Sequence, residues 1–340
     1  MPKVNLKAYA EAATLPPYKE KRYLTVHLTR KDPHALTLEL RYFNVTVGCR
    51  SLRIMPRINR GDLSVKAKHY WELVFAERFM EYPVESLDEH LGIPIAEFFT
   101  VVRDGRNVFH HRNQKYYEVG TAGALLRLIE RTVLCTASAI LHVADGQTKA
   151  WTVSQEGSRT GGRDLDPMCL AKWKLWNNTR HDVRLAAVFL PPWQFSHADF
   201  ADFIEGSTIT LWFSQISTGS ISKHDARPGE LMWARIYDYC YSSDCHYWVV
   251  TSYDHWVFGI FSKNFMQGWT TELYHRDSTD PTVLQLVVFW MHSAFTAKNT
   301  WSIPQTPTEP EENPTDERPC HSGRLWASNP KAVMQLLASS

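Results

Sequence analysis

Four arginines, Arg50, Arg53, Arg57 and Arg60, recur every three or four residues between apolar side chains. In a helix, residues at this spacing share one face. Guanidinium groups form charge-assisted and often bidentate hydrogen bonds with phosphate oxygens, so such a row could make several contacts with a nucleic-acid backbone. These arginines are therefore the candidate nucleic-acid-binding residues. The alternative is a solvated face, or one paired with the acidic residues of 309–317.

The arginines belong to a longer basic stretch. Residues 19–68 hold 12 Lys or Arg against 4 Asp or Glu. Residues 1–150 hold 22 basic and 16 acidic side chains, and residues 151–340 hold 15 and 20, so the total of +1 hides two oppositely charged halves. A total this close to zero argues against a dedicated basic binder. It leaves open a structural protein whose charge split serves self-association.

Cysteine and histidine occur in patterns that fall short of a metal site. Cys240, Cys245 and His246 form one cluster, whereas closed zinc sites pair two clusters at tighter spacing. Buried or loop cysteines explain this pattern better. The histidines outside it that could gather, His110, His111, His142 and His181, are spread through a chain with 15 histidines, so surface and core roles are favoured.

Two further patterns indicate other chemistry only in part. The segment 157–162, Gly-Ser-Arg-Thr-Gly-Gly, has the residue types of a phosphate-binding loop but lacks the lysine of a P-loop. Ser158, Ser214 and Ser252 are not in the G-x-S-x-G turn of serine hydrolases. An ordinary loop and ordinary serines are the favoured interpretations.

The elements that must position these residues follow from the hydrophobic pattern. Apolar residues at helical spacing predict helices at 64–79, 120–143, 229–241 and 281–297. Alternating or short apolar runs predict strands at 151–155, 182–190, 208–216, 247–251 and 255–261. Helices interleaved with strands indicate an α/β fold with a mixed central sheet flanked by helices.

From residue 120 onward the predicted order resembles the core of PD-(D/E)XK nuclease-like proteins, a restriction-endonuclease-like fold. In that core a helix precedes three strands, and a second helix precedes further strands. Residues 233–240 and the hairpin 245–262 carry the resemblance, and they look like the helix and hairpin of fungal-type members. The similarity covers residues 118–297, a little over half of the chain.

The resemblance implies a magnesium site. The family places an Asp at the end of the second strand and a Glu/Asp-x-Lys triplet on the third, and the two carboxylates hold Mg²⁺, which prefers oxygen ligands. Asp182 fills the first position here, while the triplet position falls on 215–217, Gln-Ile-Ser. Asp182 and Gln215 are thus the candidate metal ligands. Lys223 and Glu130 are the candidate replacements for the missing lysine and carboxylate.

These substitutions weaken the case for catalysis. Gln215 is neutral, Ser217 cannot replace a cation, and loss of a catalytic group typically costs about 10²- to 10⁴-fold in rate. The sequence therefore favours a non-catalytic or weakly active nuclease-like protein that binds nucleic acid or a protein partner. The alternatives are a Mg²⁺-dependent nuclease that hydrolyses phosphodiester bonds, and a structural or interaction protein.

Composition separates a basic N-terminal extension (1–110) from an acidic, Pro-rich tail (301–340), which we expect to be disordered apart from a short helix near its end. The resemblance assigns the nuclease-like core to 111–300. No apolar run reaches the roughly 18 residues needed to span a bilayer, and the N-terminus lacks the apolar stretch of a secretory signal. Six sparse cysteines favour reduced thiols. We expect an intracellular protein without a membrane partner.

Overall fold

The structure is a computed structural model that describes residues 3–20, 53–75, 81–83, 117–119, 122–156, 169–175, 183–193, 195–205, 228–295 and 297–304. Its helices are α1 (Leu6–Ala12), α3 (Arg60–Phe75), α6 (Ala122–Ile129), the π-helical turn η2 (Glu130–Leu134), α7 (Cys135–Ala144), the 3₁₀ turn η3 (Gly146–Ala150), α8 (His197–Glu205), α10 (Pro228–Ser243) and α11 (Val283–Ala294). Its strands are β1 (Lys3–Asn5), β2 (Tyr18–Glu20), β3 (Arg53–Ile54), β4 (Glu81–Pro83), β5 (Tyr117–Val119), β6 (Trp151–Glu156), β7 (Cys169–Leu175), β8 (Val183–Phe189), β9 (Tyr247–Thr251), β10 (His255–Phe261), β11 (Gln267–Thr270) and β12 (Tyr274–His275).

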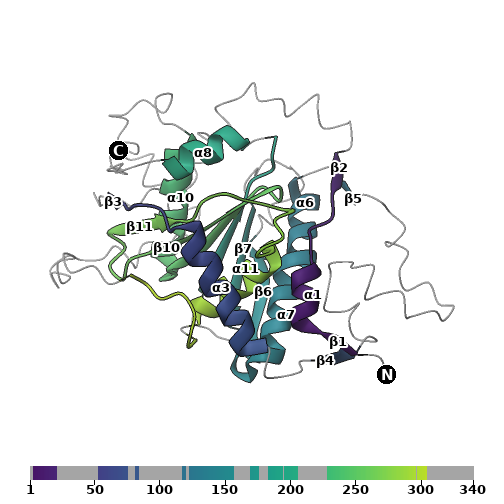
Figure 1. The fold of residues 1–340 in the computed structure, drawn as a ribbon. Coiled ribbons are helices and arrows are strands. Elements are labelled where there is room, and N and C mark those ends of the chain that lie inside the picture. Colours follow the sequence, from purple (N-terminus) through teal and green to yellow (C-terminus); the bar gives the residue numbers. More distant parts are fainter. Residues whose placement is uncertain are drawn as a thin grey trace, which may run out of the picture.

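A mixed sheet forms the centre of the fold (Figure 1). Its strands follow the order β3-β11-β10-β9-β8-β7-β6, and β12 pairs with β10 beside this path. Strands β6, β7 and β8 form an antiparallel meander, β9 runs parallel to β8, and β10 and β11 continue antiparallel. The short strand β3 then adds to β11 in parallel. The predicted α/β fold with a mixed sheet is confirmed.

The central strands are buried on both faces, and alternate residues belong to separate cores. On β9, Val249 packs into the larger core and Val250 into the smaller one. On β8, Leu185 and Phe189 contribute to the larger core, whereas Val188 contributes to the smaller. This alternation is the two-residue period of a strand with both faces covered.

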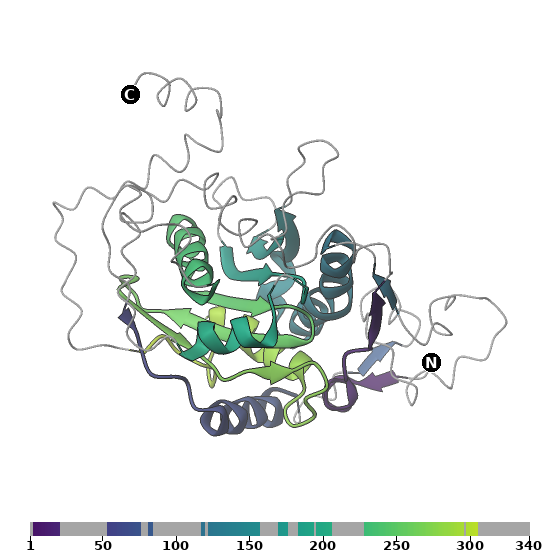
Figure 2. The ribbon, with the colours of Figure 1, turned by 90° about the horizontal axis from the view of Figure 1, so that it is seen from above.

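Helices cover the two faces of the sheet. Helices α1, α3, α7 and α11 pack with the larger core, and in Figure 1 they lie in front of the strands. Helices α8 and α10 pack with the smaller core on the opposite face, so the strands lie between α3 and α10 when the molecule is seen from above (Figure 2). None of the helices within the described ranges is long and apolar enough to cross a membrane.

Several predicted elements are confirmed closely. The hairpin strands β9 and β10 have the predicted bounds, and Trp248 and Trp256 are completely buried core residues. Helices α10, α11 and α3 agree with the predictions to within a few residues at each end. The predicted strand 208–216 and the tail beyond residue 304 lie outside the described residues.

The helical arrangement considered for the four arginines is wrong for the part that the structure describes. Arg53 lies in β3, Arg57 follows that strand in an extended segment, and only Arg60 lies in a helix, as the first residue of α3. The physical reason is the edge of the sheet: the Met55 N–H bonds to the Gly268 carbonyl at 2.8 Å. Backbone pairing to β11 therefore overrides the helical spacing.

Described parts of 1–110 contribute to the same core as the sheet. Leu6 and Tyr9 of α1 and Leu63 and Trp71 of α3 are buried in the larger core. The Trp71 indole N–H donates to the Gln285 carbonyl of α11 at 3.1 Å. The division into an extension and a core at residue 110 stays a prediction.

The start of α11 depends on a capping box, which supports our first stability prediction. The Thr282 hydroxyl accepts from the Gln285 N–H at 3.2 Å and donates to the Ala10 carbonyl at 2.7 Å, and the Gln285 side chain accepts from the Thr282 N–H. Replacing Thr282 with Ala should cost about 1–2 kcal/mol of unfolding free energy. Urea unfolding measures it, with Thr282→Ser as the control that keeps the hydroxyl. Equal stabilities of the two variants would contradict the capping role.

Candidate functional site

Most of the predicted catalytic residues lie outside the described part of the chain. Asp182, Gln215 and Lys223 are not among the described residues, and neither is Arg50. Glu130 is described and lies on the helical segment before the meander. The catalytic assignment therefore stays a prediction.

Glu130 begins an irregular turn inside the long helix. The predicted helix 120–143 forms as α6, η2 and α7, in which five residues from Glu130 adopt π-helical geometry. The Thr132 hydroxyl bonds the Leu128 carbonyl at 2.6 Å, which satisfies an acceptor where the helical ladder changes. Single π-helical turns inside α-helices often occur at functional sites. Glu130 thus remains a candidate because of its backbone setting.

The order of the strands corrects one sequence assignment. Strand β7 lies between β6 and β8 and was not predicted, so 182–190 is the third strand of the meander and not the second. Lys172 and Lys174 interrupt the apolar residues of β7, which hides it from a search for short apolar runs. The assignment of the carboxylate-x-lysine position to 215–217, which lie outside the described residues, stays a prediction.

Strand β8 offers little acid-base chemistry. Its described residues hold no carboxylate and no lysine, and those from Leu185 to Phe189 are all buried. Arg184 is its one charged residue, and it is exposed. The Arg184 guanidinium lies 5.7 Å from the centre of the Trp151 ring, within reach of a cation–π contact.

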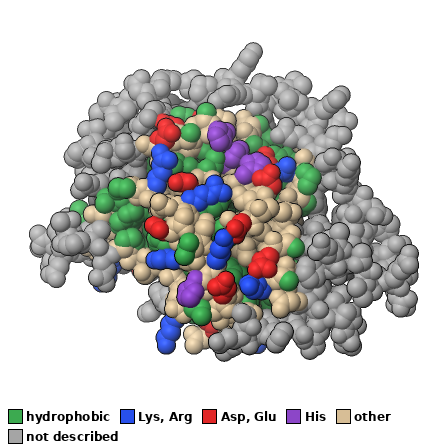
Figure 3. Space-filling view, in the orientation of Figure 1, with side chains coloured by type: hydrophobic (Ala, Val, Ile, Leu, Met, Phe, Trp, Pro, Cys, Tyr) green, Lys and Arg blue, Asp and Glu red, His purple; other side chains and the backbone are tan. Residues whose placement is uncertain are grey.

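Most of the basic side chains at the described end of this stretch contact other residues of the chain. Arg57 is exposed, whereas the Arg60 guanidinium lies 4.8 Å from the centre of the Tyr274 ring. Lys66 lies over the Trp301 ring at 4.3 Å, and Lys68 pairs with Asp280 at 2.7 Å. In Figure 3, which shows the molecule in the orientation of Figure 1, acidic and basic side chains are interspersed over the visible face.

The cysteine and histidine pattern near residue 240 belongs to the core. Cys240 and Cys245 are free, buried thiols, and burial raises the pKa of Cys240 well above its ordinary value. The Cys245 thiol donates to the Tyr247 carbonyl at 3.2 Å. The His246 ring stacks on Phe265 at 4.4 Å, and burial lowers the His246 pKa. These contacts fit structural side chains.

The histidines that the sequence suggested as a cluster do not lie together within the described part of the chain. The His142 Nε2 contacts the Ser138 hydroxyl at 3.2 Å and the Trp151 carbonyl at 2.9 Å. Trp151 begins β6 at one end of the sheet, whereas His246 directly precedes β9 at its centre. His110, His111 and His181 lie outside the described residues.

A different row of three histidines lies beyond the carboxyl ends of the parallel strands β8 and β9. His255 is the first residue of β10, and His275 faces it directly across the antiparallel pair with β12. His197 begins α8, and its Nδ1 lies 3.3 Å from the Nε2 of His255. The centre of the His255 ring lies 5.1 Å from the centre of the His197 ring and 5.4 Å from that of the His275 ring. Figure 3 shows histidine side chains gathered at the surface in the upper part of this face.

Local sequence explains why the row forms here. The Ser196 N–H and hydroxyl both bond the Asp199 carboxylate, at 2.7 and 2.6 Å, which starts α8 at His197. The turn between β9 and β10 is braced by the Thr251 hydroxyl, which accepts from the Tyr253 N–H at 2.8 Å. This turn places His255 at the start of β10, beyond the carboxyl end of β9.

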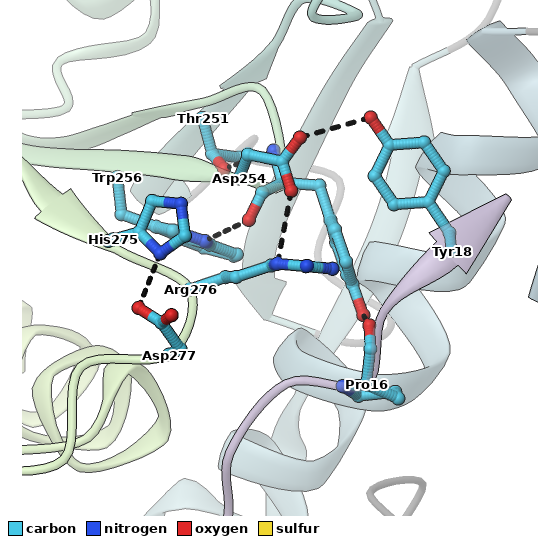
Figure 4. A network of polar contacts seen from close by, with 9 residues as sticks. Pro16, Tyr18, Thr251, Asp254, Trp256, His275, Arg276 and Asp277 are labelled. Atoms are coloured by element: carbon cyan, nitrogen blue, oxygen red, sulfur yellow. Dashed lines mark hydrogen bonds and ion pairs between the residues drawn. The ribbon is translucent and has the colours of Figure 1, made fainter. Parts of the chain in front are cut away.

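A polar network holds the same turn to the N-terminal segment (Figure 4). The Asp254 carboxylate accepts from the Tyr18 hydroxyl at 3.1 Å and pairs with the Arg276 Nε at 3.2 Å. The Tyr253 hydroxyl donates to the Pro16 carbonyl at 2.6 Å. Beside Arg276, the His275 Nδ1 bonds the Asp277 carboxylate. The network thus holds the two segments that carry His255 and His275.

Burial and neighbouring charge act together on His255. Desolvation lowers the pKa of His255, and the nearby His197 and His275 lower it further, while Asp254 opposes the shift. The net effect favours the neutral imidazole of His255. Within the described ranges, no group of three or more His, Cys, Asp or Glu side chains is placed to hold a metal ion as it stands.

Sequence reasoning missed this row because its members are far apart in the chain. His197 and His255 are 58 residues apart, and each is flanked by ordinary polar residues. Only the cross-strand register and the start of α8 bring them together. The predicted hairpin was the one available signal, because it placed His255 at the start of a strand.

No protein-family description, curated protein or solved structure matches this chain.

Proposed function

We propose that the protein is a nuclease-like module that binds nucleic acid without cleaving it. The order of its elements is the main support. A helical segment precedes the meander β6-β7-β8, helices α8 and α10 follow, and β9 then runs parallel to β8. This is the order that the resemblance to PD-(D/E)XK nuclease-like proteins implies, although the strand numbering shifts by one.

The chemistry of the third strand favours binding over cleavage. The family reaction requires two carboxylates for Mg²⁺ and a lysine, and the described residues of β8 supply none of them. The residues of β8 after Arg184 are buried between two cores and cannot contact a substrate. A protein that keeps this scaffold without those groups would retain a surface for binding and lose the metal-dependent step.

The basic stretch is the proposed contact with phosphate. Its described end is built into the edge of the sheet through β3, so a ligand bound there would lie against the folded core. Arg57 is exposed at this edge. Because Arg60, Lys66 and Lys68 have partners within the chain, we expect moderate affinity that depends on Arg50, Arg53 and Arg57.

One observation favours metal-dependent cleavage as a second candidate function. With β8 as the third strand, Asp182 directly precedes it and stands two residues before Arg184. A carboxylate followed by a guanidinium is then the nearest match to the family's triplet. An arginine can stabilise developing negative charge, and Glu130 on the preceding helix is the candidate second carboxylate.

Binding is tested by fluorescence anisotropy with labelled duplex DNA and duplex RNA over a series of salt concentrations. We expect affinity to fall steeply with salt, and Arg57→Ala to reduce the slope of log K against log salt by about one. Lys149→Ala, an exposed lysine outside the basic stretch, is the matched control and should leave the slope unchanged. A flat salt dependence, or equal slopes for the two variants, would contradict the proposal.

Cleavage is tested separately with Mg²⁺ or Mn²⁺ and the same substrates. The proposal predicts no cleavage by the wild-type protein, and calorimetric titration of Mg²⁺ with no difference between the wild type and Asp182→Ala. Cleavage that disappears in Asp182→Ala, with folding and binding intact, would replace the binding module with the nuclease. Cleavage unchanged in Asp182→Ala would reject that residue assignment.

A further inference from the structure

We propose that His197 and His255 form a binding site for one divalent transition-metal ion, of which Zn²⁺ is the simplest probe. The two imidazoles come from different elements, the start of α8 and the start of β10, and meet at the surface. The inference is independent of the proposed contact with nucleic acid, because that contact involves the basic residues around β3 and the metal site involves none of them.

The separation of the two nitrogens fits a shared metal. His197 Nδ1 and His255 Nε2 are 3.3 Å apart. Two nitrogens bound to Zn²⁺ at about 2.0–2.1 Å and at a tetrahedral angle lie about 3.3–3.4 Å from each other. The separation of the nitrogens therefore already matches a shared ion, and the rings need to turn so that their lone pairs converge on it.

The protonation state also fits. A metal binds the neutral imidazole through the nitrogen that carries no hydrogen. As the pair stands, one hydrogen lies between the two nitrogens, and either ring could donate it. On metal binding, the donor ring would take its other tautomer, with the hydrogen on the far nitrogen.

The surroundings favour a cation. Asp199, Asp254 and Asp277 each lie within two residues of one of the three histidines, against one cation, Arg276. Phe200 lies beside His255, with ring centres 5.6 Å apart, and forms an apolar wall on that side. A metal bound by the pair would thus have Phe200 beside one of its ligands and Asp254, whose charge acts on His255, nearby.

His275 is the neighbour that we exclude from the ligand set. Within the described residues no three His, Cys, Asp or Glu side chains are placed to hold one ion, and the His275 ring centre lies 5.4 Å from that of His255. The Nδ1 of His275 is already bonded to Asp277. We therefore expect two protein ligands, with water at the remaining positions. Such a site binds more weakly than the closed, four-ligand sites of structural zinc proteins.

The experiment is calorimetric titration of Zn²⁺ into the full, untagged chain in a buffer that does not chelate metal. We expect one saturable site per chain, and a loss of affinity of at least about tenfold in His197→Gln and in His255→Gln, because even groups that only support a ligand typically contribute ten- to a hundredfold. Thermal unfolding gives a second readout. Zn²⁺ should raise the Tm of the wild type but not of the two variants.

His275→Gln is the matched control, since it removes a histidine from the same row. We expect its Zn²⁺ affinity to stay close to that of the wild type. Circular dichroism without metal checks that all variants fold. No saturable binding by the wild type, unchanged affinity in both His197→Gln and His255→Gln, or an equal loss in His275→Gln would each overturn the proposed ligand pair.

Discussion

Replacing Gly259 with Ala should prevent folding or cost at least about 3 kcal/mol of unfolding free energy, well beyond a typical surface substitution. Gly259 lies in β10 directly opposite Trp248 of β9. A Cβ atom at this position would lie 2.0 Å from the Trp248 Cζ2, a distance that real Cβ contacts do not show. The measurement is urea unfolding, or recovery of folded protein if the variant cannot be purified.

The tryptophan cannot move away to relieve this clash. Trp248 is completely buried. Its ring centre lies 5.3 Å from that of Trp233 and 5.9 Å from those of Phe203 and Phe261. Gly259 also pairs with Thr270 of β11, so the backbone is held from both sides. The glycine is thus required for space within the sheet.

Two further variants make this prediction specific. Gly146→Ala is the control, because nothing lies within 4 Å of a Cβ at that exposed position, and its stability should change by less than about 1 kcal/mol. In the double variant Gly259→Ala/Trp248→Leu, the smaller side chain leaves room for the added methyl group. We expect it to be more stable than Gly259→Ala alone. A double variant less stable than the single one would contradict the steric explanation.

Much of the fold could be predicted because local pattern and tertiary contact agree. The hairpin β9-β10 has continuous apolar strands around a short polar turn, and both of its faces are buried as such runs indicate. Helix α11 carries apolar residues all round and is buried throughout. For these segments the environment in the fold is the one that the residues alone favour.

The missed elements are those whose pattern is interrupted or short. Lysines separate the apolar residues of β7, whereas neighbouring strands supply its ladder on both sides. Helix α8 is nine residues long, and its apolar stripe has three members, Phe200, Phe203 and Ile204. Missing β7 displaced the numbering of the strands that follow it by one.

The candidate sites were harder to predict than the fold. Arg53 and Arg57 have helical spacing, but the pairing of β3 with β11 determines their backbone. The histidine pair depends on register between β10 and β12 and on where α8 begins, which one sequence does not specify. Residue types that carry chemistry become a site only through contacts between distant segments.

Replacing His292 with Leu should cost about 2 kcal/mol of unfolding free energy. His292 of α11 lies between two other elements. Its Nδ1 accepts from the Tyr70 hydroxyl of α3 at 2.8 Å, and its Nε2–H points to the Asp145 carboxylate at 3.4 Å. Without the imidazole, the Tyr70 hydroxyl is buried with its acceptor removed. Asp145 retains access to water, because its side chain is 28% exposed.

A double-mutant cycle separates the hydrogen bond from packing. In Tyr70→Phe/His292→Leu both polar partners are replaced, so no buried hydroxyl or ring nitrogen is left unpaired. We expect the double variant to lose less stability than the sum of the two single variants, by about 1 kcal/mol or more. Additive losses, measured by urea unfolding at pH 7, would show that the bond contributes nothing beyond packing.

The same histidine makes the stability depend on pH. Burial lowers the pKa of His292 below its ordinary value of about 6.5, although Asp145 opposes the shift. Below that ordinary pKa the unfolded chain binds a proton that the folded protein resists, so stability is full above pH 6.5 and falls as the pH decreases toward the folded pKa. His246 and His255, whose pKa values are also lowered by burial, add to this loss. Urea unfolding at several pH values should therefore show a shallower acid decline for His292→Leu than for the wild type, and parallel declines would assign the acid sensitivity to other groups.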